Sequence, residues 1–366
     1  MYLSSEALAS PLVPYTAGLT PVFVAAKYNL PLDQVSKLGS AENHFGASPL
    51  ATEAVTRTLG RLSAYPEWSA RVLREKIGAK YGYDPDWVVC GCGETEIMSW
   101  VIRAFAAAGD KILMHEPCFP LYHKIAEAEG RVPVFQPMGE DFKFHFDDFI
   151  EKIAPDVRVV FVTAPHSPTG KMPAEADVRR VIEAARDAVV VLDEAYVHFS
   201  GSEGYIHLAR EYDNVIVMRT FSKVFGLGGL RVGFAIGHPR IASALMRMKP
   251  TWNLGQLQIA GATAALDDDA HVAKTVAMIA EMRELVTGAI RKLNRFRVIE
   301  GSKANFFLLQ LPEGYDSTEV WGRLLAKGVI VKDGNIDFRG IQGRFLRIDV
   351  APRPHMERLV AALASL

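Results

Sequence analysis

Residues 215–223 read VIVMRTFSK, and this stretch decides the fold. Its apolar start is typical of a short buried strand, and polar residues Thr220, Ser222 and Lys223 follow at once. A glycine-rich segment and Arg231 come next, so backbone here can pass close to a ligand. Burial and the charge of Arg231 would both lower the pKa of the Lys223 amine, and an imine with an aldehyde requires a free amine. Lys223 is therefore a candidate nucleophile, with a surface loop as the alternative.

A second apolar run, at residues 188–192, leads directly into the sequence DEAY at 193–196. An acid at the carboxyl end of a buried parallel strand faces the crevice where α/β sheets bind ligands. Asp193 can there keep a pyridine nitrogen protonated, which makes pyridoxal phosphate an electron sink. Tyr196 can donate to the phenolic oxygen of the same ring. The alternative for Asp193 is a helix cap.

A third segment, GCGETE at residues 91–96, lies between a strand-like run and a helical pattern. Such a turn presents free backbone N–H groups and the positive end of a helix dipole to an anion. Thr95 adds a hydroxyl, and Ser222 and Arg231 can reach the same phosphate. The glycine spacing is not that of a dinucleotide site, and a plain connection between strand and helix is the alternative.

Two further residues are candidates for ligand contacts. Phe119 follows the strand-like residues 111–114 and can stack on the cofactor ring, although core packing is the commoner role of a phenylalanine. Arg347 interrupts the strand-like residues 345–349, and its guanidinium can hold a carboxylate through two hydrogen bonds. An arginine at a strand edge otherwise faces water.

In order, the chain contains GETE at 93–96, PTG at 168–170, DEAY at 193–196, SK at 222–223, Arg231 and Arg347. This series resembles the class I/II aminotransferases of fold type I, over nearly the whole chain. The histidinol-phosphate aminotransferase branch is the most similar. That similarity rests on KLGSAEN at 37–43, YP at 65–66, RTFSK at 219–223 and LRI at 346–348.

The resemblance implies a role for each residue around the cofactor. Lys223 would form the Schiff base with pyridoxal 5'-phosphate, Asp193 would pair with the ring nitrogen, and Tyr196 would meet the ring hydroxyl. Phe119 would stack on the ring. The phosphate and the remaining cofactor contacts would come from Gly93, Glu94, Thr95, Ser167, Thr220, Ser222 and Arg231.

Further residues would bind the substrate or link two subunits. The resemblance assigns Arg347 to the substrate carboxylate and places Tyr15 over the substrate, with Asn43 and Lys332 nearby. Tyr65 resembles a family tyrosine that reaches the cofactor phosphate of the neighbouring subunit. A homodimer with shared active sites follows from that residue.

The chain departs from the family at three positions. Ser167 stands where the family has an asparagine that donates to the phenolic oxygen. Because serine is shorter, three outcomes are open: the hydrogen bond is lost, it runs through water, or His166 takes it over. Asn43 is followed by HFG at 44–46, where the branch usually has a proline. Lys332 replaces the arginine that binds the substrate phosphate, and a lysine binds phosphate without the planar fork.

The predicted reaction is ping-pong transamination between a small-molecule amino donor and a 2-oxo acid acceptor. Ser167 keeps open a decarboxylase, an oxidase or a replacement enzyme on the same scaffold. A cofactor-sensing module of a transcription regulator is the alternative from another class. That module would need a basic helix-turn-helix before Tyr15, and none is seen there.

Composition limits the partners. The 366 residues are 49% hydrophobic by type, with 41 basic and 42 acidic residues, which gives no electrostatic reason to expect nucleic acid or a membrane surface. No apolar run approaches the ~20 residues of a membrane span, and the start does not resemble a signal peptide. We therefore expect a cytoplasmic location. Three cysteines predict neither a disulfide framework nor a metal site.

The order of predicted elements indicates an α/β fold. Strand-like runs at 88–90, 111–114, 158–162, 189–192, 215–218 and 232–236 alternate with helical patterns. This alternation predicts a large, doubly wound, mostly parallel sheet within residues 33–250, of the seven-stranded type by resemblance. A long amphipathic helix at 271–293 opens a smaller α+β domain, which consists of residues 251–366 with the N-terminal arm 1–32.

Overall fold

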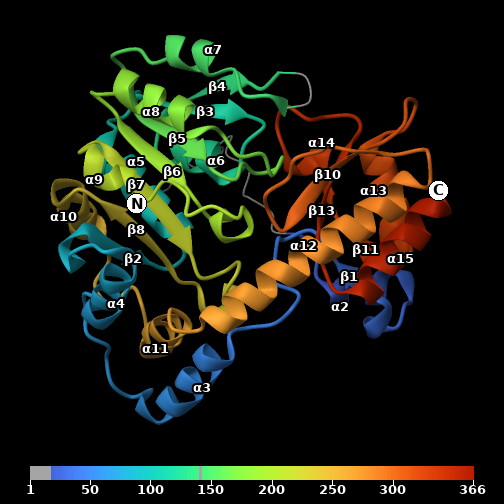
Figure 1. The fold of residues 1–366 in the computed structure, drawn as a ribbon, viewed down its shortest axis with the longest axis horizontal. Helices are drawn as coiled ribbons and strands as arrows, with labels where there is room; N and C mark the ends of the chain where they lie inside the picture. Colours follow the sequence, from blue (N-terminus) through green and yellow to red (C-terminus); the bar gives the residue numbers. More distant parts are fainter. Residues whose placement is uncertain (1–17, 140–141) are drawn as a thin grey trace, which may run out of the picture.

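The structure is a computed structural model that describes residues 18–139 and 142–366. Two domains of unequal size lie next to each other (Figure 1), the larger built on a seven-stranded sheet and the smaller on a four-stranded sheet. The predicted Tyr15 lies outside the described residues. No helix in the described ranges is long and apolar enough to cross a membrane.

The large sheet has the strand order β2-β8-β7-β6-β5-β3-β4. Its strands are β2 (Val88–Gly91), β3 (Lys111–Glu116), β4 (Val132–Pro137), β5 (Val157–Thr163), β6 (Val189–Asp193), β7 (Val215–Thr220) and β8 (Gly233–Gly237). Only β8 runs antiparallel to its neighbours β2 and β7, and the other pairings are parallel. The prediction of a doubly wound, mostly parallel sheet is confirmed.

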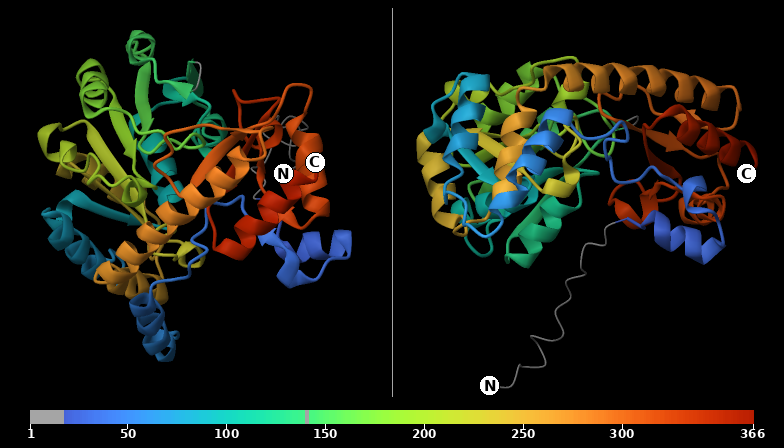
Figure 2. Two further views of the ribbon diagram at one scale, coloured as in Figure 1. Left: turned by 45° about the vertical axis from the view of Figure 1, so that its right-hand side comes forward. Right: turned by 90° about the horizontal axis from the view of Figure 1, so that it is seen from below.

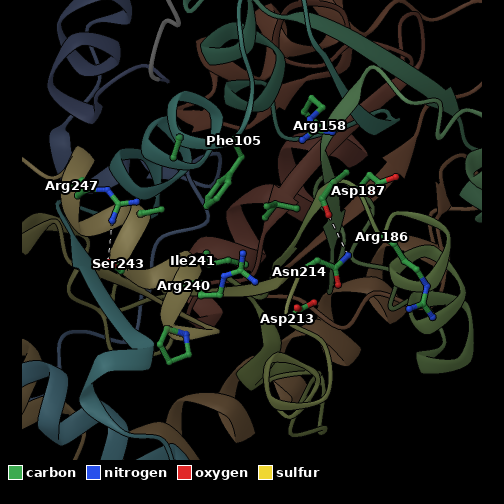
Figure 3. Close-up of a pocket in the computed structure, with 15 residues that line it drawn as sticks. Phe105, Arg158, Arg186, Asp187, Asp213, Asn214, Arg240, Ile241, Ser243 and Arg247 are labelled. Carbon is green, nitrogen blue, oxygen red and sulfur yellow. Dashed lines mark hydrogen bonds between the residues drawn. The ribbon is translucent and has the colours of Figure 1, made fainter.

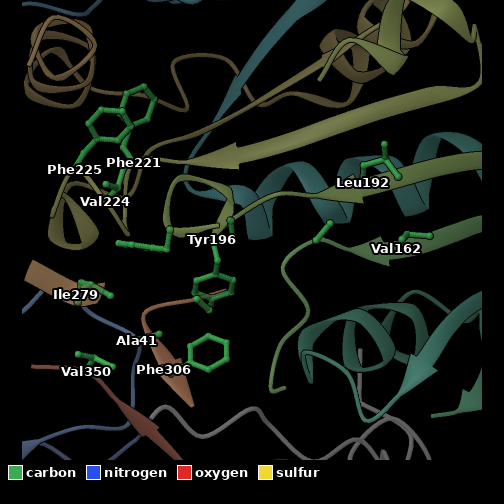
Figure 4. Packing of buried hydrophobic residues seen from close by; sticks show 14 of the residues in the cluster. Ala41, Val162, Leu192, Tyr196, Phe221, Val224, Phe225, Ile279, Phe306 and Val350 are labelled. Carbon is green, nitrogen blue, oxygen red and sulfur yellow. The ribbon is translucent and has the colours of Figure 1, made fainter. Parts of the chain in front are cut away.

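The sheet is buried on both faces, which explains why its central strands read as unbroken apolar runs. Successive side chains of a strand point to opposite faces. In β6, Val190 and Leu192 pack into one apolar cluster, and Val189 and Val191 pack into another. The first cluster continues past Tyr196 to Phe306 of the small domain (Figure 4). The two domains therefore share one core.

Helices cover each face of the sheet. One face packs against α5 (Glu94–Phe105), α6 (Leu121–Ala128) and α10 (Pro239–Met248). The other face packs against α4 (Arg71–Tyr81), α7 (Phe146–Glu151), α8 (Glu175–Ala184) and α9 (Leu208–Glu211). This arrangement leaves the carboxyl ends of the parallel strands facing the small domain.

Strand β4 is absent from the strands that the sequence predicts. It holds Pro133 and Pro137, which argue against a strand because proline cannot donate a backbone hydrogen bond. The strand pairs only with β3, at the edge of the sheet, where proline is tolerated.

The small domain contains the antiparallel sheet β12-β13-β10-β9 and a separate parallel pair, β1 with β11. Its strands are β1 (Ser36–Lys37), β9 (Arg297–Val298), β10 (Phe306–Gln310), β11 (Val329–Ile330), β12 (Lys332–Asp333) and β13 (Phe345–Asp349). Its helices are α2 (Pro21–Tyr28), α13 (Ser317–Ala326), α14 (Gly334–Asp337) and α15 (Arg353–Ala364).

Helix α12 (Asp269–Arg291) runs from the large domain to the small one (Figures 1 and 2), close to the range predicted for it. The domain boundaries at residues 33 and 250 stay a prediction, and two observations bear on them. Strand β1 pairs with β11 of the small domain, and α11 (Gln256–Ala265) packs against α3 (Pro49–Thr58).

Candidate active site

A buried pocket of about 140 Å³ lies at the carboxyl ends of β5, β6 and β7. This edge of a parallel sheet is where α/β proteins bind ligands. Eleven of the predicted cofactor residues are described in or beside this pocket, and ten of them line it: Glu94, Thr95, Phe119, Ser167, Asp193, Tyr196, Thr220, Ser222, Lys223 and Arg231. Gly93 immediately precedes this set. Segments that are far apart in the chain therefore meet at one place.

Lys223 follows β7 and places its amine inside the pocket. Its Nζ donates to the carbonyl oxygens of Ala41 at 3.1 Å and Ser40 at 3.4 Å. Burial first, and then the charge of Arg347, lower the pKa of Lys223 to about 8. The sequence suggested Arg231 for this effect, but the cation that acts on the amine is Arg347. A substantial fraction of the amine is therefore free at neutral to mildly alkaline pH.

Asp193 ends β6 and is buried next to the same space. Its Oδ2 accepts from the Tyr122 hydroxyl at 2.5 Å, and its Oδ1 accepts from the backbone N–H of Ala195 at 3.0 Å. Burial raises the pKa of Asp193, while these two hydrogen bonds and the charge of Lys223 oppose the rise. Neither hydrogen-bond donor is a cation. A protonated ring nitrogen would supply the missing positive charge, which fits a pyridine cofactor.

Tyr122 is a site residue that the sequence reasoning missed. It lies on α6, lines the pocket, and shares a hydrogen bond of 2.8 Å with the Thr163 hydroxyl. Its ring stacks on Phe161 with centroids 4.4 Å apart, so the hydroxyl is fixed toward Asp193. One signal was present, because Tyr122 follows Phe119 by only three residues and lies in the first turn of α6.

The phosphate end of the pocket is built by the start of α5 and the loop before β8. Gly93 has φ +74°, and a methyl group at this position would overlap the guanidinium of Arg231. Arg231 Nη1 donates to Ser222 Oγ at 3.3 Å and to the carbonyl of Gly228 at 3.2 Å. A helix N-terminus, two hydroxyl-bearing residues and an arginine thus converge, as an anion requires.

Phe119 and Tyr196 occupy two sides of the same pocket. The Phe119 ring meets Tyr122 edge-on at 5.6 Å, which keeps a flat face available for a ring in the pocket. Tyr196 is buried and meets Phe306 edge-on at 4.9 Å. Burial raises the pKa of the Tyr196 hydroxyl, so it stays a hydrogen-bond donor.

Arg347 enters the site from β13 of the small domain. Its Nη2 donates to the carbonyl of Gly39 at 2.9 Å, and its Nη1 lies 3.5 Å from Ser167 Oγ. Its Nε is buried and has no hydrogen-bond partner within the described ranges. Arg347 thus bridges the two domains beside the residue that replaces the family asparagine.

Ser167, and not His166, lines the pocket. His166 is buried behind it, where its Nδ1 shares a hydrogen bond of 2.8 Å with the Thr169 hydroxyl. Burial lowers the pKa of His166 to about 4, so the ring is neutral. His166 is therefore not placed to take over the contact that the resemblance assigns to the family asparagine.

Lys332 lies directly opposite Arg347 in the sheet of the small domain. Its Nζ forms a largely buried ion pair of 2.6 Å with Asp337 Oδ1. The second carboxylate oxygen of Asp337 accepts from the backbone N–H of Asp333 at 2.9 Å. The Asp337 carboxylate therefore balances the charge of the Lys332 ammonium group, which was expected to bind a substrate phosphate.

Asn43 and Tyr65, like Gly93, Lys332 and Arg347, are not among the residues that line the pocket. Asn43 holds the loop around Lys223, because its Nδ2 donates to the carbonyl of Val224 at 2.9 Å and its Oδ1 accepts from Phe45 at 3.0 Å. Tyr65 is 78% exposed and stacks on Trp252 with centroids 4.5 Å apart.

Comparisons with known proteins identify the family and the fold of the chain. The aminotransferase class I and II family model matches residues 33–363. A histidinol-phosphate aminotransferase of Anaeromyxobacter sp. (strain Fw109-5) is 34% identical over 97% of this chain and 96% of its own length. One from Methanopyrus kandleri is 36% identical over 92% of this chain and 89% of its own length. The histidinol-phosphate aminotransferase structure from Sinorhizobium meliloti, in complex with pyridoxal-5'-phosphate, has a TM-score of 0.86 at 23% identity. It covers 99% of this chain and 98% of that one, and it shows the same fold.

Proposed function

Since the chain belongs to the aminotransferase class I and II family and is a pyridoxal-phosphate-dependent enzyme, we propose that Lys223 is its cofactor-binding and proton-transferring residue. One observation carries this proposal. The amine of Lys223 has a pKa lowered to about 8 and lies in the same buried pocket as Asp193 and the phosphate-binding groups. The carboxyl group of Asp193, the amine of Lys223 and the anion site are the groups that one pyridoxal-phosphate reaction needs in the same place.

When bound, pyridoxal phosphate supplies an aldehyde for the substrate amine and an electron-poor ring that stabilises negative charge on the adjacent carbon. Asp193 would hold the proton on the ring nitrogen, and Tyr122 and Ala195 hold Asp193 in place. Thr95, Ser222 and Arg231, which line the pocket, would bind the phosphate together with the adjacent Gly93. Binding through several groups fixes the orientation of the ring.

Lys223 Nζ acts as general base and general acid. An amine with a pKa near 8 can take the proton from the substrate carbon and return it at a neighbouring carbon at similar cost. The backbone carbonyls of Ser40 and Ala41 hold the amine when it is charged. Replacement of substrate by a second one in the same pocket gives ping-pong exchange.

Arg347 orients the anionic group of the substrate. The Nε of this guanidinium is buried without a described partner, and its Nη1 faces Ser167 at the pocket wall. A carboxylate of an amino acid or a 2-oxo acid would satisfy it. A substrate phosphate at Lys332 would in addition have to compete with the carboxylate of Asp337. We therefore assign the arginine to a carboxylate and the donor to an amino acid.

A homodimer completes this proposal. Large apolar side chains between the end of α3 and the start of α4 are exposed in the single chain: Leu59, Leu62, Tyr65, Trp68 and Val72. Trp252, between α10 and α11, is also exposed and stacks on Tyr65. Exposed apolar patches of this kind mark interfaces. In the dimer Tyr65 would contact the cofactor phosphate of the partner subunit. The cytoplasmic location stays a prediction of the sequence.

Two measurements test the proposed function. Borohydride reduction of the purified protein should leave a pyridoxyl mass on Lys223, found by peptide mass spectrometry. Incubation with candidate amino acids and 2-oxoglutarate should then give glutamate. Carbon dioxide or peroxide in place of glutamate would overturn transamination and favour the decarboxylase or oxidase alternative.

A further inference from the structure

One acidic side chain of the cofactor pocket has no part in the proposed mechanism. Glu94 is the first residue of α5, at the helix terminus that faces the pocket, and it is one of the residues that line the pocket. Its Oε1 is buried and has no hydrogen-bond partner among residues 18–139 and 142–366. A buried polar atom without a partner costs about 1–3 kcal/mol. Its position therefore indicates a partner on the ligand.

The charge of Glu94 is unusual for its place. The start of α5, Ser222 and Arg231 form an anion site, and an ionised carboxylate there would repel a phosphate. Burial first, and then the charge of Asp193, raise the pKa of Glu94 well above its ordinary value. Lys223 and Arg231 oppose the rise. The acid form has one O–H donor, which a phosphate oxygen can accept.

We propose that Glu94 is a positioning residue whose carboxyl group keeps its proton in the pocket and donates it in a hydrogen bond to the cofactor phosphate. This inference rests on the proposed function, because it needs the phosphate of pyridoxal phosphate at the start of α5. Residue 94 then contributes two donors, its backbone N–H and its carboxyl O–H. Loss of the proton turns the second contact into a repulsion, so the affinity for the phosphorylated cofactor falls as the pH rises.

Other groups face the pocket and titrate or carry charge. They are Tyr122 on α6, Asp193 at the end of β6, Tyr196 after it, Lys223 after β7, and Arg231 before β8. Glu194, which pairs with Arg219 outside the pocket, also acts on Glu94 through its charge. The experiment has to separate Glu94 from these groups. Lys223 matters most, because its free amine reacts with the aldehyde and so makes capture of the cofactor depend on pH in the opposite direction.

The test therefore uses the full chain with Lys223→Ala, which removes the reactive amine from every protein compared. The dissociation constant for pyridoxal 5'-phosphate is measured by fluorescence between mildly acidic and alkaline pH, with and without Glu94→Gln. With Glu94 present, the constant should rise by about tenfold per pH unit once the carboxyl loses its proton. Glutamine cannot ionise and keeps a donor, so this additional rise should be absent with Glu94→Gln.

Two controls identify the phosphate as the partner. Unphosphorylated pyridoxal should show parallel pH profiles with Glu94 and with Glu94→Gln. Glu96→Gln changes an acid of the same helix turn. Glu96 accepts hydrogen bonds from Cys92 N–H at 2.6 Å and from Asn253 Nδ2 at 2.9 Å, so this variant should keep the pH profile of the parent protein.

Glu94→Ala should bind the cofactor more weakly at acidic pH and also lack the alkaline rise in the dissociation constant. It serves as the second variant if the glutamine protein does not fold.

The possible failures are distinct. Parallel profiles of the Glu94 and Glu94→Gln proteins for pyridoxal 5'-phosphate would overturn this inference alone. An equal effect on unphosphorylated pyridoxal would also overturn it, because the carboxyl would then act on the ring. Absence of any cofactor binding, together with no pyridoxyl label on Lys223 in the unaltered protein, would overturn the proposed function and this inference with it.

Discussion

The two ends of the large sheet carry two very different cavities. At the carboxyl ends of the parallel strands is the buried pocket of about 140 Å³ that holds Lys223 and Asp193. At the amino ends of the same parallel strands lies an open cavity of about 930 Å³. Arg158, Arg186 and Arg240 are among the residues that line it (Figure 3). The larger space is not the better candidate site, and the reason is chemical.

In the small pocket, buried groups change one another's protonation. Lys223 has a lowered pKa, Asp193 has a raised one, and Tyr122 connects to Asp193 by a hydrogen bond. In the large cavity the guanidinium groups are mostly exposed to water, and none of its arginines forms an ion pair within the described ranges. Convergent, desolvated groups of complementary chemistry distinguish an active site, and volume alone does not.

The largest effect that tests this comparison is expected from Lys223→Ala. Transamination should fall to background, because no other amine lines the small pocket in the described part of the chain. The cofactor should still bind without a covalent bond, since the phosphate groups and Asp193 remain. Glutamate formation measures the first outcome. A fluorescence titration with pyridoxal 5'-phosphate measures the second, and borohydride should leave no pyridoxyl mass on the variant. Activity close to that of the unaltered protein would remove Lys223 from its proposed role.

Asp193→Ala should have the next largest effect. Without the carboxylate the ring nitrogen loses the partner that keeps it protonated, so the ring withdraws electrons less well. We expect a rate loss on the order of a hundredfold or greater, equivalent to an activation free energy raised by about 3 kcal/mol or more. The measurement is kcat for glutamate formation with saturating cofactor. A variant within a few-fold of the parent would contradict the assignment.

Tyr122→Phe should have a smaller effect with a distinct signature. It keeps the ring stacked on Phe161 but removes the hydrogen bond to Asp193, worth about 1.5–3 kcal/mol to a charged group. That hydrogen bond lowers the pKa of Asp193, so its loss should raise this pKa further. The acidic limb of the kcat profile should therefore move to higher pH. A lower kcat with an unshifted profile would indicate a purely structural role.

The sequence predicted the fold and most of the pocket because the relevant signals are local. Apolar runs such as residues 215–218 end in polar residues, and the carboxyl ends of parallel strands necessarily meet. Edge strand β4 was missed because Pro133 and Pro137 are tolerated only where one side of a strand is unpaired. That is a property of the assembled sheet.

The missed features of the site depend on long-range contacts. Tyr122 meets Asp193 across 71 positions, and Lys332 is balanced by Asp337 only because α14 turns back on β12. Likewise, the charge of Arg347 lowers the pKa of the Lys223 amine, although Arg347 is 124 positions away in the chain. The sequence had suggested the neighbouring Arg231 for this effect. Motifs identify which residues converge, whereas burial and pairing determine the charge that each one carries.

The smallest effect is expected at the large cavity. Arg240→Ala and Arg247→Ala change exposed side chains of α10, of which Arg247 has a single described hydrogen bond, 3.1 Å to Ser243 Oγ (Figure 3). Each should leave kcat/KM within about twofold and the free energy of unfolding within about 0.5 kcal/mol, as is usual for surface substitutions. Steady-state kinetics and urea unfolding measure the two quantities. A tenfold loss of kcat/KM without loss of stability would mean that this end of the sheet also serves the reaction. The contrast between buried convergence and open volume would then no longer identify the site.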